Sequence, residues 1–393
     1  MPRREEKRNL ETIPVGTLGV IPLRGCHEMG EMVDKFLVGW RTERENEHKG
    51  SLAFTGYERP SYLLSAEVPR FGSGEGKGVI NESVRGADLY LLVDVMNHAQ
   101  TYSLFGKQNH MSPDDHYQDL KRIIAAIGGK ARRITVIMPF LYEGRRHKRN
   151  ARESLDCAIA LQELVRMGVD NIITFDAHDA RVQNAIPLHG FETVRTTYQF
   201  LKSLTRHVQG LTIDSEHMMV ISPDEGGMSR AIYLASVLGL DVGMFYRRRD
   251  YTVVENGVNP IVAHEFLGSS VEGKCAIIID DMISSGESIL EVAKEMKERG
   301  ATKVFLYATF GMFTRGLADF DKAHEEGVFD MAFTTNLIYQ SPELLAREWF
   351  GNIDMSKYIA YLIDTLNHDA SISDLLNPVE RIHDLVARYH ENR

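Results

Sequence analysis

The segment Cys275–Ile289 (CAIIIDDMISSGESI) joins an apolar run to two carboxylates and a hydroxyl-rich turn that leads into a helical pattern. Backbone N–H groups of such a turn, and of a helix amino terminus, bind phosphate well. Asp280 and Asp281 stand at the end of the expected strand, where open α/β sheets bind ligands, and suit the vicinal hydroxyls of a ribose. Gly286 lets the backbone approach closely. The hydroxyl donors are Ser284, Ser285 and Ser288.

This motif predicts a site for a phosphorylated ribose. An acidic strand end followed by an ordinary capped helix is the simpler interpretation, and such caps are common. It leaves two adjacent carboxylates after a wholly apolar strand unexplained. The motif alone does not distinguish an enzyme that makes an activated ribose phosphate from one that consumes it.

Short apolar runs elsewhere in the chain predict buried strands, because they are rich in β-branched and aromatic residues and end in polar turns. They are Leu89–Val95, Ile134–Phe140, Asn171–Phe175, Met218–Ser222, Cys275–Ile279 and Val304–Phe310. Helical periodicity separates them at Ser154–Gly168 and Ser288–Gly300, each ending in a glycine. The alternation predicts an α/β fold with mostly parallel sheets flanked by helices.

The length of 393 residues indicates two or three domains. Both halves repeat the order strand, polar turn, helix, so we expect two similar domains with a boundary near Leu201–Ser215. Residues 1–60 read as an N-terminal extension with the first elements, 61–205 as one domain and 206–355 as the other. Thr101–Tyr117 reads as an inserted polar loop, and Asp250–Ser270 as a long loop and mobile lid.

Composition excludes several classes of protein. The 45 basic and 55 acidic residues give a net charge of −10, which argues against nucleic-acid binding. Three dispersed cysteines suit a reducing cytoplasm. The first nine residues lack the apolar core of a secretory signal, and no apolar run approaches the roughly 18 residues of a membrane helix. We therefore expect a cytoplasmic protein with no membrane partner.

Beyond the ribose motif, the sequence resembles the ribose-phosphate pyrophosphokinase family, whose product is 5-phosphoribosyl 1-diphosphate (PRPP). Six blocks occur in the family's order, and such an ordered set is far more specific than one motif. They are Phe71–Glu75 with Glu82–Asp88, Ile137–Lys148, Asp176–Pro187, Val220–Ala231, Asp280–Ser288 and Ser356–Leu376.

This resemblance implies two phosphoribosyltransferase-type domains with the active site between them, the first completed by a C-terminal helix near 356–376. It implies a ribose-phosphate diphosphokinase that uses ATP, ribose 5-phosphate and Mg²⁺. It also implies a homo-oligomer built from dimers, such as a hexamer, in which a neighbouring subunit contributes to the nucleotide pocket.

Site residues follow from the same resemblance. His178 and Asp224 would hold the metal, while Arg247 and Arg249 would act on the transferring phosphates. Phe71 would stack on adenine. The other nucleotide-binding positions are Ser73, Glu75, Arg145, Arg146 and His147.

Several positions depart from the family pattern. Arg247 stands where the family has lysine, and a guanidinium is not equivalent to an ammonium. Ser73 replaces an aspartate, Arg146 and His147 replace glutamine and aspartate, and Glu287 replaces a small residue. Glu287 is expected to point outward, near the helix amino terminus that favours its charge. Two alternatives stay open: a catalytically weak regulatory homologue and a PRPP-consuming phosphoribosyltransferase.

Overall fold

The computed structural model describes residues 12–44, 51–149, 152–249 and 261–391, which form two compact units. The first contains residues 1–195, 337–339 and 354–377, and the second contains 196–336, 340–353 and 378–393. The chain thus leaves the first unit at Arg195 and returns to it twice. The sequence predicted a domain boundary between residues 205 and 206. That boundary refers to the two phosphoribosyltransferase-type domains of the family and stays a prediction.

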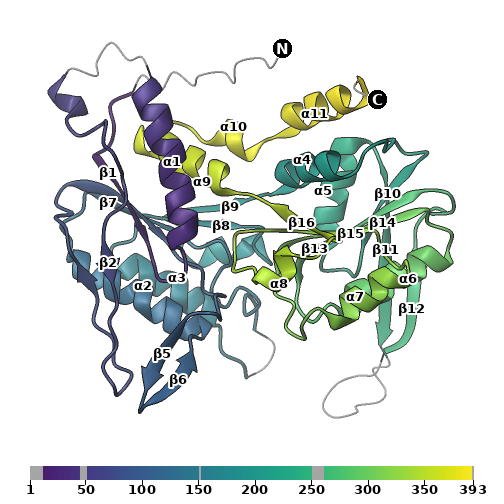
Figure 1. Cartoon of the computed structure of the whole chain (residues 1–393), viewed down its shortest axis with the longest axis horizontal. Coiled ribbons are helices and arrows are strands. Elements are labelled where there is room, and N and C mark those ends of the chain that lie inside the picture. The colour runs from purple at the N-terminus through teal and green to yellow at the C-terminus, as the bar shows by residue number, and fades with distance from the viewer. Residues whose placement is uncertain (1–11, 45–50, 150–151, 250–260, 392–393) are drawn as a thin grey trace. The chain divides into compact units, whose positions relative to one another are not determined.

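The first unit is built on a five-stranded parallel sheet with the order β1-β4-β7-β8-β9. The strands are β1 (Thr17–Pro22), β4 (Ala87–Leu92), β7 (Arg133–Ile137), β8 (Asn171–Phe175) and β9 (Gly190–Val194). Helices α2 (Pro113–Ile127) and α3 (Asp156–Arg166) bury their apolar sides against one face of the sheet. Helices α1 (His27–Glu43) and α9 (Ser356–Asn367) pack together on the other face (Figure 1).

Smaller elements complete this unit. They are the ribbons β2–β3 (Ala66–Glu67, Val79–Ile80) and β5–β6 (Thr101–Leu104, Lys107–His110), the short helix α10 (Ser373–Leu376), and the 3-10 helices η1 (Leu52–Phe54) and η2 (Ala180–Ala185). The segment Thr101–Tyr117 is therefore not a polar loop, because it forms the β5–β6 hairpin and the start of α2. Ser112 and Asp115 form a reciprocal cap there.

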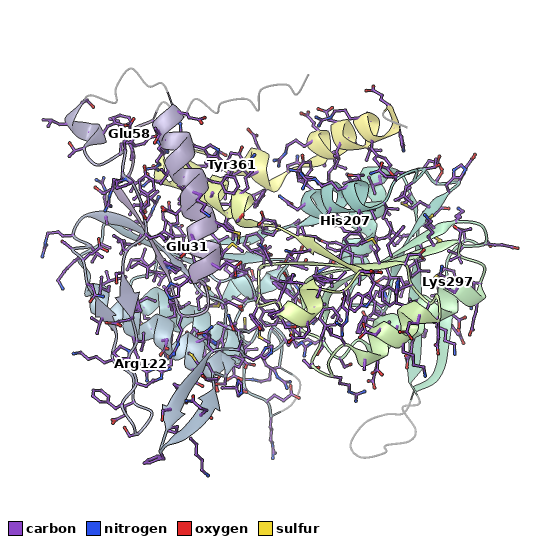
Figure 2. The ribbon with its side chains drawn as sticks, in the orientation of Figure 1. Glu31, Glu58, Arg122, His207, Lys297 and Tyr361 are labelled. Carbon is purple, nitrogen blue, oxygen red and sulfur yellow. The ribbon has the colours of Figure 1, made fainter. Side chains whose placement is uncertain are left out.

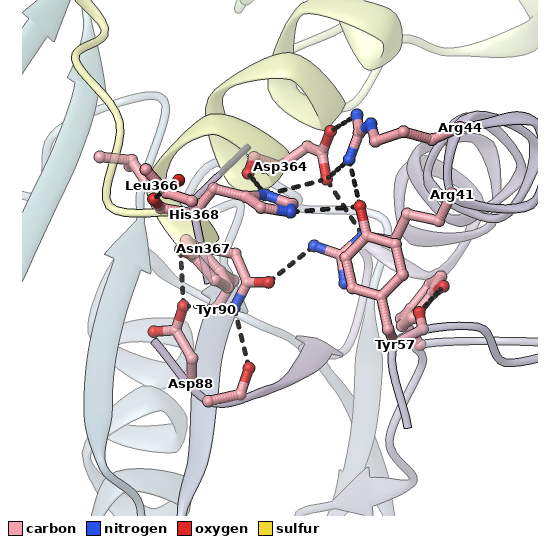
Figure 3. A network of polar contacts seen from close by, with 12 residues as sticks. Arg41, Arg44, Tyr57, Asp88, Tyr90, Asp364, Leu366, Asn367 and His368 are labelled. Atoms are coloured by element: carbon pink, nitrogen blue, oxygen red, sulfur yellow. Dashed lines mark hydrogen bonds and ion pairs between the residues drawn. The ribbon is translucent and has the colours of Figure 1, made fainter. Parts of the chain in front are cut away.

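A buried network fixes the returning helix α9 to the first unit (Figure 3). The guanidinium of Arg41, only 1% exposed, donates to Asp364 at 3.0 Å and to Asn367 at 2.7 Å. Asn367 donates in turn to Asp88 at 2.8 Å. Because these groups are paired, their charges are tolerated in the core.

The second unit has a seven-stranded sheet with the order β12-β11-β10-β13-β14-β15-β16. Its strands are β10 (Met218–Ser222), β11 (Asp241–Arg249), β12 (Ile261–Leu267), β13 (Cys275–Ile283), β14 (Lys303–Gly311), β15 (Met331–Thr335) and β16 (Phe350–Ile353). All pair in parallel except β12, which runs antiparallel to β11. The helices are α4 (Thr197–His207), α5 (Met228–Leu238), α6 (Glu287–Glu298), α7 (Ala318–Glu325), α8 (Pro342–Leu345) and α11 (Val379–Glu391).

The predicted α/β class and the six strands are confirmed, but the expected loop Asp250–Ser270 is wrong over part of its length. Ile261–Leu267 forms strand β12, whose cross-strand pairing with β11 overrides its weak periodicity. Residues 250–260 of the expected lid lie outside the described part of the chain. Strand β13 also runs past Asp280 to Ile283. Within the described segments, no helix is long and apolar enough to cross a membrane.

Candidate active site

The ribose-phosphate motif lies in the second unit, where β13 leads through a turn into α6. Gly286, the residue before α6, has φ +90°, and a Cβ there would lie 2.3 Å from the ring of Phe320. Only glycine fits this position without strain. Among the described residues no side chain caps the amino end of α6, so its backbone N–H groups suit a phosphate. The hydroxyl residues Ser284, Ser285 and Ser288 are half-buried around this turn.

Asp280 and Asp281 are successive residues within β13 rather than beyond its end. Their side chains alternate across the sheet: Asp280 is half-buried, and Asp281 is 3% exposed. The carboxylate of Asp281 lies 3.7 Å from the guanidinium of Arg230 in α5. Burial, the Asp281 charge and the Asp224 charge together raise the pKa of Asp280 well above its ordinary value. This concentration of carboxylates suits cations and hydroxyl donors.

Asp224 follows β10, the strand beside β13. Its Oδ1 accepts from the backbone N–H groups of Gly226 (2.8 Å) and Gly227 (3.1 Å), and Ser222 donates to its carbonyl. Asp224 is therefore a turn residue in this structure. That turn uses Oδ1 of the carboxylate rather than Oδ2.

The predicted catalytic residues Arg247 and Arg249 belong to β11, on the other side of β10. Their backbone pairs with β12, at His264 and Ile261. Their side chains lie outside the described part of the structure, so their catalytic role stays a prediction.

The predicted base-binding loop is in the first unit and closes on itself. The N–H of Phe71 donates to the carbonyl of Glu75, and the N–H of Gly74 donates to the carbonyl of Phe71, both at 2.8 Å. Ser73 Oγ donates to Glu75 Oε2 at 2.8 Å. Phe71, Ser73 and Glu75 are all exposed, with 59% of Phe71 accessible. The loop thus presents an aromatic face and a hydrogen-bonding edge to its surroundings.

Two histidines from adjacent strands of the first unit meet beside Asp179. His147 follows β7, His178 follows β8, and their ring centroids are 5.3 Å apart. His147 Nε2 lies 3.5 Å from the Asp179 carboxylate, whose pKa the Arg181 guanidinium lowers. His147 Nδ1 is buried and, among the described residues, has no hydrogen-bond partner. A buried unpaired nitrogen is costly, so this atom suits a polar ligand.

Arg145 and Arg146 are exposed on the turn before His147. The structure shows how this turn and the base-binding loop are supported, because both contact helix α2. Tyr142 donates to Asp114 at 2.6 Å, and Arg70 forms an ion pair with Asp119. The first unit therefore holds all six predicted nucleotide-binding residues, and the second holds the predicted ribose-phosphate residues.

The sequence did not identify Arg230, Asp179 or Arg70 as contributors to the candidate site. Arg230 lies in the quoted block Val220–Ala231, three residues after Gly227, and that position near the start of α5 was the available signal. It also missed a cavity of about 270 Å³ in the first unit. That cavity contains none of the predicted site residues and is lined in part by Arg24, His116 and Asp119.

Two α/β units of this kind, one carrying an acidic strand, a glycine turn and a helix amino terminus, define a two-domain phosphoribosyltransferase-type protein. Family models agree with this class. Residues 24–168 match the N-terminal domain of ribose phosphate pyrophosphokinase, and residues 260–377 match the phosphoribosyl synthetase-associated domain.

Relatives identify the family. The chain is 31% identical over 321 residues to the ribose-phosphate pyrophosphokinase of Vibrio parahaemolyticus, covering 80% of this chain and 92% of that protein. It is 30% identical to the Pasteurella multocida protein of that name, covering 79% and 90%. Phosphoribosylpyrophosphate synthetase from Mycobacterium smegmatis shares the fold, with a TM-score of 0.69, 21% identity and coverage of 90% and 100%. The chain belongs to the ribose-phosphate pyrophosphokinase family, a class of diphosphotransferases.

Proposed function

We propose that this protein transfers the β,γ-diphosphoryl group of ATP to the 1-hydroxyl of ribose 5-phosphate, giving PRPP and AMP. The observation that carries the proposal is the turn at Gly286 between β13 and α6, with two carboxylates in the strand that leads into it. A phosphate at the amino end of α6 puts the sugar hydroxyls within reach of the acidic strand.

The second unit would bind and orient the sugar. Backbone N–H groups of the turn and the hydroxyls of Ser284, Ser285 and Ser288 would hold the 5-phosphate. Asp280 would accept from a ribose hydroxyl, while Arg230 holds Asp281 in place. Positioning of this kind is the main contribution of a protein to phosphoryl transfer, which needs little covalent chemistry from it.

The first unit would bind ATP. Phe71 supplies a stacking surface, and Ser73 with Glu75 supplies the hydrogen bonds to the edge of the base. Arg145, Arg146 and His147 would pair with the phosphates, His147 through its buried Nδ1. Arg247 and Arg249 would neutralise the charge of the transferring group.

The residues present fit the Mg²⁺ that accompanies a triphosphate. Mg²⁺ prefers oxygen ligands and retains several waters, so it needs few protein ligands. The turn at Asp224 uses Oδ1 rather than Oδ2, and the Asp224 charge adds to the repulsion that raises the Asp280 pKa. A divalent cation would relieve that repulsion. In the second unit Asp224 would bind such an ion, and in the first unit His178 would bind a metal-bound water; a bound ion would neutralise phosphate charge.

The test is AMP formation by the purified protein with ATP, Mg²⁺ and ribose 5-phosphate, with the sugar omitted as the control. AMP that depends on the sugar supports the proposal. Diphosphate release from PRPP and a nucleobase would instead indicate a phosphoribosyltransferase. Folded protein that forms no nucleoside monophosphate from ATP or from any other nucleoside triphosphate would refute the proposal. That outcome would favour a regulatory homologue, which the arginine at position 247 already motivates.

A further inference from the structure

We propose that Phe105, at the tip of the β5–β6 hairpin, is a base-recognition residue that adds a second aromatic surface to the site formed by the Phe71–Glu75 loop. The inference rests on the proposed function, because it names how this protein holds its nucleotide. It also assigns a purpose to Thr101–Tyr117, the segment that reads as an insertion.

The hairpin tip is bonded directly to the base-binding loop. The backbone N–H of Phe105 donates to the carbonyl of Gly72 at 2.8 Å. Gly74 has φ +92°, and a Cβ there would lie 2.6 Å from Leu104. A Cβ at Gly72, by contrast, would meet no atom of the described residues within 4 Å, its chain neighbours aside. In the described part of the chain, the hairpin therefore packs against the loop at Gly74 and leaves space beside Gly72.

The base of the hairpin is held as firmly as its tip. The guanidinium of Arg70, the residue before Phe71, lies 5.0 Å from the centre of the Tyr102 ring and forms an ion pair with Asp119 of α2. Tyr102 Oη donates to Asp115 of the same helix at 3.3 Å. Arg122, which is labelled in Figure 2, also donates to Asp119 at 2.7 Å. Because loop and hairpin share these anchors, Phe105 is held in a fixed position relative to Phe71.

The turn itself gives no local reason for a phenylalanine. Leu104 pairs with Lys107, so Phe105 and Gly106 form a two-residue turn, with φ of +46° and +75°. Such turns favour Asn-Gly, and a bulky residue at positive φ is a strained exception. Phe105 is also 81% exposed, so apolar burial does not offset the strain. Strained residues of this kind cluster where they serve a ligand.

The chemistry of a nucleobase suits this arrangement. Phe71 and Phe105, 59% and 81% exposed, are large apolar side chains joined through the Phe105–Gly72 bond. A flat heterocycle gains from each aromatic face that it contacts. Ser73 and Glu75 would bind the polar edge of the base, while Phe71 and Phe105 would contact its faces.

Phe105→Asn is the decisive variant, because asparagine is the residue that this turn prefers. It removes the ring without disturbing the hairpin. We expect KM for ATP to rise roughly three- to tenfold, the range of one aromatic contact. The kcat and the KM for ribose 5-phosphate should stay unchanged. Leu52→Ala, at a residue 93% exposed in η1, is the matched control and should leave all three constants unchanged.

Phe105→Trp supplies a readout independent of turnover. The nucleotide is α,β-methylene-ATP, which cannot break at the bond that the proposed reaction uses. We expect its binding to quench the fluorescence of the added tryptophan, measured as the difference between the variant and wild type. Leu52→Trp should show no such quench.

Unchanged KM for ATP in Phe105→Asn, or no quench in Phe105→Trp, would overturn the inference. A changed oligomeric state of Phe105→Asn in size-exclusion chromatography, with KM for ATP unaltered, would also overturn it, since Phe105 would then be a subunit contact. If wild type forms no AMP, the proposed function fails, and the fluorescence experiment still decides whether Phe105 contacts the nucleotide.

Discussion

Replacing Gly286 by alanine should damage the ribose-phosphate turn for two separable reasons. The φ of +90° puts an alanine in a region that costs about 1–2 kcal/mol. The new methyl would also lie 2.3 Å from the fully buried ring of Phe320, and overpacking of this kind costs about 1–3 kcal/mol. We expect Gly286→Ala to lower the free energy of unfolding of the second unit by about 2–5 kcal/mol.

Phe320→Leu separates the two causes. The smaller side chain makes room for the methyl, and this large-to-small change at a fully buried ring should cost about 1–3 kcal/mol alone. The double variant should then be more stable than the sum of the single effects by at least about 1 kcal/mol, because the clash is gone while the backbone strain remains. The Kd for ribose 5-phosphate should rise in Gly286→Ala, and the double variant should recover part of the lost affinity.

Tryptophan fluorescence can report the unfolding of the second unit separately from that of the first. Trp349 stacks near Phe320 at 5.7 Å between ring centres, whereas Trp40 lies in α1 of the first unit. A Trp40→Phe background therefore makes Trp349 the sole tryptophan, and urea unfolding reports on the unit that carries the substitution. Additivity of the two single effects within about 0.5 kcal/mol would refute the steric reasoning.

Four further predictions follow from the described contacts and from the family resemblance. Asp364→Asn should lower the free energy of unfolding, measured in urea, by about 3–5 kcal/mol, because it leaves the charge of a buried arginine unpaired. Glu298→Gln removes an exposed ion pair and should lower it by less than about 0.5 kcal/mol. Burial lowers the pKa of His368 to about 4, so the unfolded state binds more protons between pH 4 and 6.5. Stability should fall as pH drops through that window, and His368→Gln should flatten the fall. Asp224→Asn should abolish turnover with an unchanged melting temperature, and retained turnover would remove it from the metal site. Arg247→Lys should keep or raise activity, and a collapse of activity would show that the site requires a guanidinium at this position of β11.

The sequence predicted the strand, turn and helix of the proposed ribose-phosphate site because this order is local, while the ligand itself stays a prediction. Strand, carboxylates, glycine and helix start occupy consecutive positions, and the structure adds only Phe320 as the physical reason for Gly286. The expected outward direction of Glu287 agrees with its exposed ion pair with Arg315. The end of β13 was missed because Asp280 and Asp281 break the apolar run, while pairing with β14 continues to Ile283.

Features that depend on distant contacts were not predictable in this way. The β5–β6 hairpin was interpreted as a polar loop because its strands are short and polar, and its stability comes from Arg70 and α2. Likewise, β12 lacks a clear apolar pattern and is defined by pairing with β11. The pairing of Arg41 with Asp364 joins residues 323 positions apart, beyond any local pattern.

The path of the chain gives these distant contacts a consequence for folding. Asp88, with no exposed surface, pairs with Arg133 at 2.8 Å and accepts from Asn367, while Arg41 pairs with Asp364. Asn367 and Asp364 lie on α9, which the chain supplies only after most of the second unit. Until α9 arrives, the first unit must either leave these charges exposed to water or bury them with partners missing, which is costly. The stability of the first unit therefore depends on the completed chain, and its elements cannot be treated as an independent N-terminal domain.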